Sequence, residues 1–231
     1  MKSKSVIRTA AGILATSVAL AAAAGEKNRE ASEFDELSII VEQNATDGDT
    51  EVVISGIAGD DGLRLLNVHA PGGRRILSLV APDPATLGER EFHFESPEPP
   101  GEAVLAGYPE GEYLFFGVST TGEHFRGSAE LSHQLPGETT ILNPVHESVI
   151  AAGSLTIQWS AVPEIREYIL EFENESADPE QALTLNLPPG VTSFEIPAGL
   201  LVAGSDFQVG VQTVSDNGNI VAVEVTFSTA E

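Results

Sequence analysis

The chain lacks cysteine altogether and has a single tryptophan among its 231 residues. Without cysteine there is no disulfide, no thiolate nucleophile and no thiolate metal site. Each folded part must then be held together by burial alone, which domains of about 100 residues can manage. Any chemistry that the chain performs must therefore use oxygen and nitrogen groups.

Basic residues are scarce: 11 Lys and Arg stand against 35 Asp and Glu, which gives a formal net charge of −24. Such a surface repels the phosphate backbone of nucleic acids and anionic membrane surfaces, so neither is an expected partner. The charge favours solubility, including in salty surroundings where it is screened. The alternative interpretation is that the negative charge attracts cations or basic partners, and this interpretation stays open.

Long apolar runs are absent except near the N-terminus, where one follows three basic residues and ends in small residues at Ala24. That run is shorter than the roughly 20 residues a bilayer span needs. Its pattern is that of a cleaved export signal. We therefore predict a signal peptide over residues 1–24, a secreted or periplasmic location and a mature chain without a membrane span. An uncleaved membrane anchor is the alternative.

Helical periodicity is also missing beyond the leader, so the βαβ units of a parallel sheet are not expected. Apolar and polar residues alternate instead, as they do in half-buried strands. In Glu91–Glu95, for example, Phe92 and Phe94 share one face. The strands expected in the first half are 37–42, 51–57, 63–69, 75–80, 91–95, 112–118 and 125–132. Seven short strands in succession indicate a β-sandwich, with the proline-containing segment 96–107 as a connecting loop.

A second set of alternating runs follows the turn-rich segment Leu135–Thr139, which is the better domain boundary. Leu155, Ile157 and Trp159 share one face of its clearest early strand. Asp216–Asn219 is a hairpin tip that joins its last two strands. The sequence thus predicts an all-β chain of two tandem β-sandwich domains. The expected parts are a signal peptide (1–24), a flexible leader (25–36), a first β-sandwich module (37–137) and a second domain (141–231).

Several core positions of the second domain match a known family. They are the Asn143-Pro144 entry, Trp159 in the second strand, Tyr168 in the third, and Phe194–Ile196. On these residues, the segment 141–231 resembles a fibronectin type III domain. The resemblance implies an immunoglobulin-like β-sandwich. At the start of the sixth strand Phe207 stands where that family has a tyrosine, so the hydroxyl hydrogen bond of a tyrosine corner is not expected here.

The first module carries a weaker resemblance, on Glu42–Asp49, Tyr108–Tyr113 and Gly127–Pro136. These stretches resemble a segment that precedes such a domain in exported bacterial proteins of unknown function. The resemblance implies an architecture and an exported location, and no activity.

The densest group of oxygen ligands is Glu42, Asn44, Asp47 and Asp49. Calcium takes six to eight oxygen ligands, often from carboxylates and carbonyls of one loop, so we consider a calcium site here. The spacing does not match an EF-hand loop. The alternative is a turn between two strands, in which Asn and Asp side chains bond to the nearby backbone.

Sequence signals of catalysis are missing. The five histidines form neither an HxH nor an HExxH pair, and no serine lies in a G-x-S-x-G elbow. We therefore predict an exported binding or scaffold protein that is not an enzyme. Its expected partner is another extracytoplasmic protein or a surface glycan.

Two other functions stay open. A carbohydrate-binding accessory protein would need exposed aromatic rings, and since Trp159 is expected in the core, Tyr108 or Tyr113 would have to supply them. A carboxylate-based hydrolase would need a deep pocket with two converging carboxylates, one of them with a raised pKa.

Overall fold

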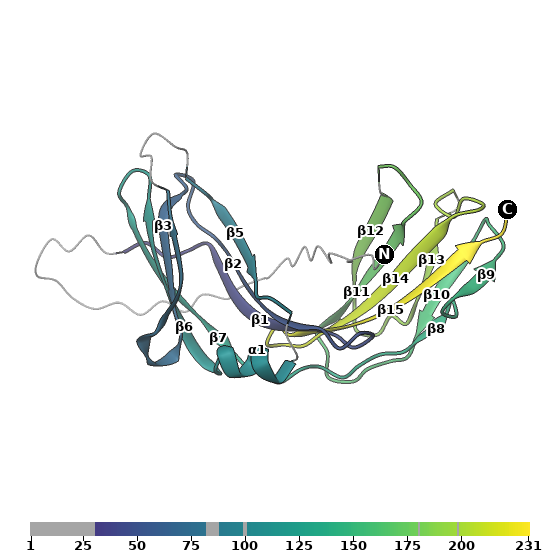
Figure 1. Ribbon diagram of the computed structural model, residues 1–231, viewed down its shortest axis with the longest axis horizontal. Coiled ribbons are helices and arrows are strands. Elements are labelled where there is room, and N and C mark those ends of the chain that lie inside the picture. The colour runs from purple at the N-terminus through teal and green to yellow at the C-terminus, as the bar shows by residue number, and fades with distance from the viewer. Residues whose placement is uncertain (1–30, 82–87, 99–100, 180, 198) are drawn as a thin grey trace, which may run out of the picture.

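The computed structural model describes residues 31–81, 88–98, 101–179, 181–197 and 199–231. They form two β-sandwich modules, and one sheet runs through both of them (Figure 1). The all-β prediction is confirmed. The predicted signal peptide and residues 25–30 of the predicted leader lie outside the described residues. Within the described ranges, no helix is long and apolar enough to cross a membrane.

The first module places two sheets face to face, and its strands lie close to their predicted bounds. One layer contains β1, β2 and β5, and the other has the order β4-β3-β6-β7. The strands are β1 (Glu36–Asn44), β2 (Thr50–Ile57), β3 (Leu63–His69), β4 (Arg75–Val80), β5 (Glu91–Glu95), β6 (Gly111–Ser119) and β7 (His124–Leu131), with a short 3₁₀ turn, η1 (Pro71–Gly73), before β4.

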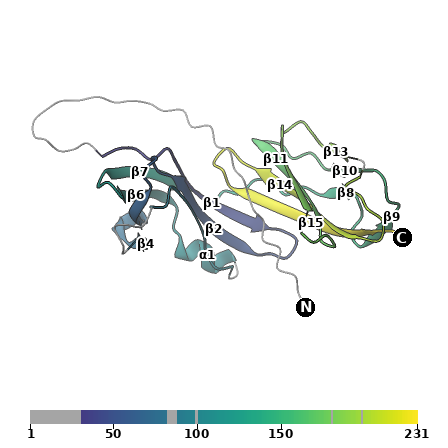
Figure 2. The same cartoon turned by 90° about the horizontal axis from the view of Figure 1, so that it is seen from above.

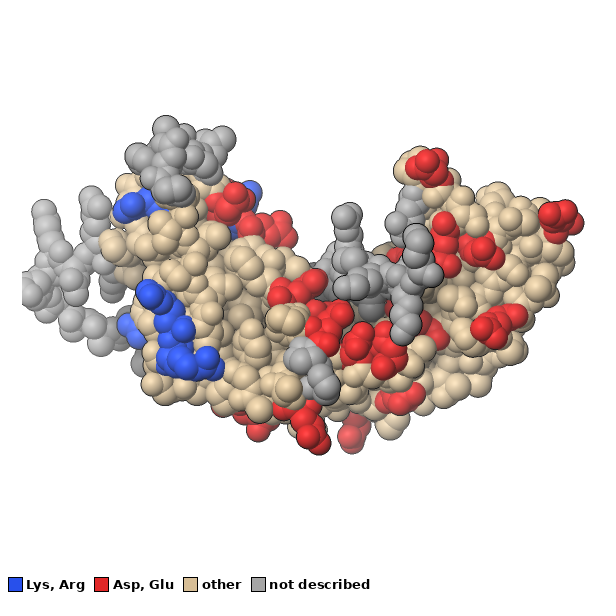
Figure 3. Space-filling view, viewed as in Figure 1, with Lys and Arg blue, Asp and Glu red and all other residues tan. Residues whose placement is uncertain are grey.

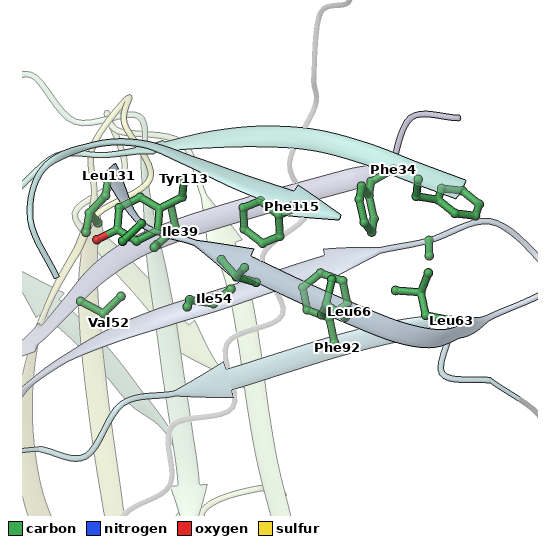
Figure 4. Packing of buried hydrophobic residues seen from close by; sticks show 14 of the residues in the cluster. Phe34, Ile39, Val52, Ile54, Leu63, Leu66, Phe92, Tyr113, Phe115 and Leu131 are labelled. Carbon is green, nitrogen blue, oxygen red and sulfur yellow. The ribbon is translucent and has the colours of Figure 1, made fainter. Parts of the chain in front are cut away.

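Aromatic rings fill the space between these two layers (Figure 4). Phe115 lies 6.3 Å from Phe34, edge to face, and 6.3 Å from Phe92, stacked. Phe34 is buried in this core, and Ser32 already forms a bridge with Phe125 of β7. The ordered module therefore begins before the predicted Leu37, because an aromatic side chain of the expected leader is part of the core.

A short helix, α1 (Gly101–Gly107), lies in the segment predicted to be only a loop. It buries Val104 against the first core. A helix of two turns carries too few residues for the 3.6-residue period to be visible, so the alternation test did not find it.

The tyrosine corner absent from the second domain has a counterpart in the first module. Tyr113, near the start of β6, is 0% exposed, and its hydroxyl donates to the carbonyl of Pro109, four residues upstream, at 2.9 Å. Burial raises the pKa of this phenol to about 12. The bond ties the segment before β6 to the core, as a tyrosine corner does.

The second module packs a three-stranded sheet, β13-β10-β8, against the four strands β12-β11-β14-β15, and the short β9 pairs in parallel with the end of β15. This three-on-four arrangement confirms the expected fibronectin type III-like fold. Phe207 fills its core without a hydroxyl, stacked on Phe172 and Phe227 at 5.3 Å from each. The strands are β8 (Ile141–Asn143), β9 (Ser148–Ile150), β10 (Leu155–Trp159), β11 (Glu167–Asn174), β12 (Gln181–Leu187), β13 (Ser193–Ile196), β14 (Asp206–Val214) and β15 (Ile220–Thr229).

The two modules are joined by direct strand pairing, which the prediction of two separate sandwiches did not include. β1 pairs in parallel with β15, with Glu42 opposite Ile220 and Asn44 opposite Ala222. The order β12-β11-β14-β15-β1-β2-β5 is therefore one sheet. Seen from above, β1 and β2 run on toward β15 and β14 (Figure 2).

One buried amide, Asn219, fastens this joint. Its Oδ1 accepts from the backbone N–H of Val41 at 2.8 Å, and its Nδ2 donates to the carbonyls of Ser132 at 2.7 Å and Gln134 at 3.0 Å. The side chain thus holds β1 and the linker after β7 to the hairpin tip before β15. Because all three partners are backbone groups of the first module and linker, Asn219 fixes one module against the other.

Replacing Tyr113 with phenylalanine should destabilise the first module by about 1–2 kcal/mol, because the hydrogen bond from the Tyr113 hydroxyl to the carbonyl of Pro109 is lost. Chemical denaturation of the two proteins measures the difference. Tyr108→Phe is the control, since its hydroxyl makes no hydrogen bond among the described residues. Equal losses for both variants would contradict the role of the Tyr113 hydroxyl.

Replacing Asn219 with alanine should cost about 2–4 kcal/mol, because the N–H of Val41 and the carbonyl of Ser132 lose their partner together, while the carbonyl of Gln134 keeps the amide of Asn217. It should also split the unfolding transition of the two modules in a calorimetric scan. Asp216→Ala, at an exposed position of the same hairpin tip, should leave a single transition. A single transition at unchanged temperature for Asn219→Ala would show that the joint does not depend on this amide.

Candidate functional site: the concave face of the shared sheet

The shared sheet has two faces with different roles. Both hydrophobic cores pack on the same side of it, because the β1–β15 register sets Gln43 beside Val221 and Glu42 beside Ile220. The opposite side lies on the inside of the curve that the shared sheet makes (Figure 1). We call this side the concave face.

An apolar band crosses the concave face at the joint between the modules. Five buried aliphatic side chains, separate from both cores, form it: Ile40, Val53, Ile169, Val214 and Ile220. They come from β1, β2, β11, β14 and β15, so the band belongs to both modules. These side chains are at most 8% exposed, so the band is a third, small buried cluster that packs the two modules together at the joint.

Carboxyl groups lie beside this band. Glu42 of β1 stands directly opposite Glu51 of β2, while Glu171 of β11 and Glu224 of β15 are both register partners of Gly210 on β14. In the space-filling view the acidic side chains gather in the middle of the molecule, and Lys and Arg lie at the far end of the first module (Figure 3). The concave face is therefore acidic where the two modules meet.

Each of these four carboxyl groups has a raised pKa. Burial, then the nearby Glu51, Glu95 and Glu171, raises the pKa of Glu42 to about 8. Burial, together with Glu95, raises the pKa of Glu51 to about 7. Glu51 thus suppresses the ionisation of Glu42 across the strand pair, and Glu95 suppresses that of Glu51.

The second carboxyl pair behaves in the same way. Burial and the neighbouring Glu173 raise the pKa of Glu171 to about 7. Burial also raises the pKa of Glu224, and the amide of Asn44, which donates to Glu224 Oε2 at 3.1 Å, partly offsets this shift. Glu171 and Glu224 are therefore held close to other acidic groups, and no basic side chain contributes to either of their pKa shifts.

Gln212 lies between the acidic groups on the concave face. It is 1% exposed, and neither Oε1 nor Nε2 has a hydrogen-bond partner of regular geometry. Its amide still lies close enough to the carboxyl of Glu171 to lower that pKa somewhat. Gln212 therefore acts as a hydrogen-bond partner of the Glu171 carboxyl within this buried group.

The proposed calcium ligands lie around the β1–β2 turn, but they do not point to one place. Asn44 Oδ1 accepts from Thr46 N at 2.9 Å and Asp47 Oδ1 from Asp49 N at 3.1 Å, as in a turn stabilised by its own side chains. Glu42 belongs to the concave face, whereas Asp47 and Asp49 are exposed. No three His, Asp or Glu of the described ranges are arranged to hold a metal ion. The calcium site stays a prediction without support from this geometry.

Other candidate residues are used structurally. Trp159 is buried and packs edge to face on Tyr168 at 5.6 Å, and Tyr113 is buried as well, so neither ring presents a face to a sugar. His93 contacts Glu95 at 2.9 Å, and His133 bonds to the carbonyl of Tyr108 at 2.8 Å. The concave face itself was missed at the sequence level.

Two solved structures of fibronectin type III domains are similar to the chain. The crystal structure of chicken CNTN1 FN1–FN3 domains is 9% identical in sequence to this chain, with a TM-score of 0.35. The match covers 86% of this chain and 65% of the CNTN1 chain. A two-domain segment from chicken tenascin is 11% identical in sequence to this chain, with a TM-score of 0.31. The match covers 84% of this chain and 97% of the tenascin segment. No family model and no curated protein matches the chain. At these values the similarities carry no information on function.

The raised carboxyl pKa values predict how stability depends on pH. Because they lie at about 7–8 in the folded protein, above the ordinary 4.5, the folded state binds protons more tightly than the unfolded chain. The contribution of these three carboxyl groups to stability should be complete below about pH 4.5 and be lost as the pH rises through 7 and 8. Denaturation curves at a series of pH values, at constant ionic strength, measure this decline.

Glu171→Gln should flatten the decline and raise the free energy of unfolding at pH 8 by about 1–2 kcal/mol, because a neutral amide replaces a carboxylate that is costly to ionise. Glu195→Gln, on the exposed face of β13, is the matched control and should leave the profile unchanged. A profile of Glu171→Gln that superimposes on that of the unmodified protein would contradict the assignment.

Proposed function

We propose that this chain is an exported, non-catalytic binding protein whose concave face takes a positively charged partner. The observation that supports this most directly is the group of four carboxyl groups with raised pKa values, which lie on the side of the shared sheet opposite to both hydrophobic cores. Groups held in unfavourable ionisation states cluster at functional sites more than elsewhere.

A cationic partner accounts for the arrangement energetically. Four carboxyl groups brought together repel each other when ionised, and burial removes the water that would screen them. A positive charge placed among them lowers their pKa values. Binding therefore offsets the destabilisation that the repulsion between the carboxylates causes.

A carboxylate hydrolase fits this face less well. Glycosidic cleavage needs one carboxyl group kept protonated and a second kept ionised, so that their environments push the two pKa values apart. Here burial and like charges shift Glu42, Glu51, Glu171 and Glu224 in the same direction. None of the four is held ionised as a nucleophile or base would be.

Binding to a surface coated with poly-L-lysine at pH 8 tests the proposal. The double variant Glu42→Gln/Glu171→Gln should bind about tenfold more weakly, because two desolvated charges facing the partner are lost. Glu112→Gln/Glu195→Gln has the same net charge and changes two exposed positions outside the concave face, so its affinity should be unchanged.

The comparison of the two double variants separates the concave face from the overall negative charge of the chain. If both bind equally well, the affinity comes from net charge alone and the proposal is wrong. If the concave-face variant alone is impaired, the partner site lies where the two modules meet.

A further inference from the structure

The four-stranded sheet of the first module buries only one of its two faces in the core. Leu66, Val68 and Phe115 belong to the buried face. Because side chains alternate along a strand, the residues between them point to the other side, which we call the outer face. Its large apolar side chains are half-buried or exposed and pack in none of the three buried clusters. They are Leu65, Val80, Leu114, Phe116 and Val118.

The strand register gathers these side chains into one patch. Leu65 of β3 lies opposite Val80 of β4 on one side and opposite Val118 of β6 on the other. Val80 is 60% exposed. In the next row Phe116 of β6 lies opposite Arg126 of β7. The outer face therefore has a continuous apolar centre that crosses β4, β3 and β6.

Basic side chains border this apolar centre. The guanidinium carbon of Arg126, on the edge strand β7, lies 5.6 Å from the ring centroid of Phe116. On the opposite edge strand, β4, the exposed Arg75 stands opposite His69, whose ring lies 5.4 Å from that of Phe116. An apolar and aromatic centre with a charged rim is the anatomy of a protein interface, where arginine and aromatic residues are enriched.

The outer face also differs in charge from most of this acidic chain. The described residues contain six arginines and no lysine, and five of the six belong to the first module (Figure 3). Within the described ranges, neither Arg75 nor Arg126 forms an ion pair with a carboxylate. The strands place two acidic residues on this face, Glu112 and Glu130, which stand opposite each other at one end of it. The two arginine charges beside the apolar centre are thus available to a partner.

We propose that the outer face docks a short acidic segment of a partner protein, in which carboxylate side chains flank apolar ones. The apolar side chains of the segment cover Phe116 and its neighbours, and the carboxylates accept charge-assisted hydrogen bonds from Arg75 and Arg126. From the strand spacing and the residue rise, the patch measures about 14 Å in each direction. That is less than the roughly 800 Å² that a partner buries in a standard interface, so it matches a segment rather than a domain.

Other occupants fit this face less well. Aliphatic side chains offer no hydrogen bonds to the hydroxyl groups of a glycan, which lose water when they are covered. An anionic membrane or a second copy of the chain brings many negative charges against a molecule of net charge −24. A short segment avoids most of this repulsion, because charges farther away than the Debye length of about 8 Å are screened.

Binding of the full chain to the acidic copolymer poly(Glu,Tyr) tests the proposal at physiological ionic strength. Poly-L-glutamate is the comparison, since it carries the same carboxylates without aromatic side chains. We expect the copolymer to bind about tenfold more tightly, because it alone covers the apolar centre. Equal affinities, or no binding of the copolymer, would overturn the proposal.

The double variant Arg75→Gln/Arg126→Gln should bind the copolymer about tenfold more weakly, because both charges at the rim are lost. Arg90→Gln/Arg166→Gln is the control with the same net charge. It changes two arginines that already contact Asp60 and Glu167, so its affinity should be unchanged. An equal loss in both double variants would assign the binding to net charge and contradict the docking face.

Val80→Thr tests the apolar centre without a risk to folding, because threonine has the shape of valine and suits an exposed edge strand. It should weaken binding of the copolymer about threefold, through the lost apolar contact, and leave poly-L-glutamate unaffected. Val149→Thr, at a valine of the second module that is 68% exposed, is the matched control and should change neither affinity. Unchanged binding of the copolymer by Val80→Thr would show that the apolar centre is not contacted.

Three further measurements distinguish the other occupants. Tighter binding of dextran sulfate than of poly(Glu,Tyr) would assign the face to an anionic glycan, and tighter binding of phosphatidylglycerol vesicles would assign it to a membrane. Self-association in sedimentation velocity that Arg75→Gln/Arg126→Gln abolishes would assign it to a second copy. Each of these results would overturn the proposal. Binding of poly-L-lysine by Arg75→Gln/Arg126→Gln should be undiminished, so the outer face and the concave face are tested independently.

Discussion

The structure depends on the parallel pairing of β1 with β15. This short ladder, with Glu42 opposite Ile220 and Asn44 opposite Ala222, turns two sandwiches into one molecule with a continuous sheet. Asn219 then satisfies backbone groups on β1 and on the linker after β7. Buried backbone groups must find partners, so the joint is specified by hydrogen bonds as well as by apolar contact. The linker is held too, since Thr213 Oγ1 donates to the carbonyl of Gly137 at 2.8 Å.

Every property of the concave face follows from that joint. The apolar band contains Ile40 and Val53 from one module and Ile169, Val214 and Ile220 from the other, so neither module alone completes it. The carboxyl pairs are divided in the same way, with Glu42 and Glu51 in the first module and Glu171 and Glu224 in the second. Placing them on one surface costs stability at neutral and alkaline pH.

Alternation of apolar and polar residues predicted the strands well, because a half-buried strand must present one apolar face. It located β3, β4 and β5 at their observed bounds. It also placed Phe207 in the core without a tyrosine's hydrogen bond. It could not predict α1, which is too short to show a period, or the role of Phe34, which stands alone in a polar leader.

The shared sheet was beyond this kind of reasoning for a physical reason. Pairing between β1 and β15 joins residues nearly 180 positions apart, as the Val41–Asn219 bond shows, and nothing local records it. One signal was present in the sequence. Ile39-Ile40-Val41, Val52-Val53-Ile54 and Ile220-Val221-Ala222 are continuous apolar runs, which are typical of strands buried on both faces. They indicated that something apolar lies on the second face, but not that both modules share it.

Hydrogen exchange at the edge of β1 tests the continuous sheet most directly. The amide of Val41 donates to Asn219 and that of Ala45 to the carbonyl of Ala222 at 2.8 Å. Both bonds exist only if the modules are joined. We expect these two amides to be protected as strongly as those in the middle of β14. Exchange at the rate of a free edge strand, with β14 still protected, would contradict the account.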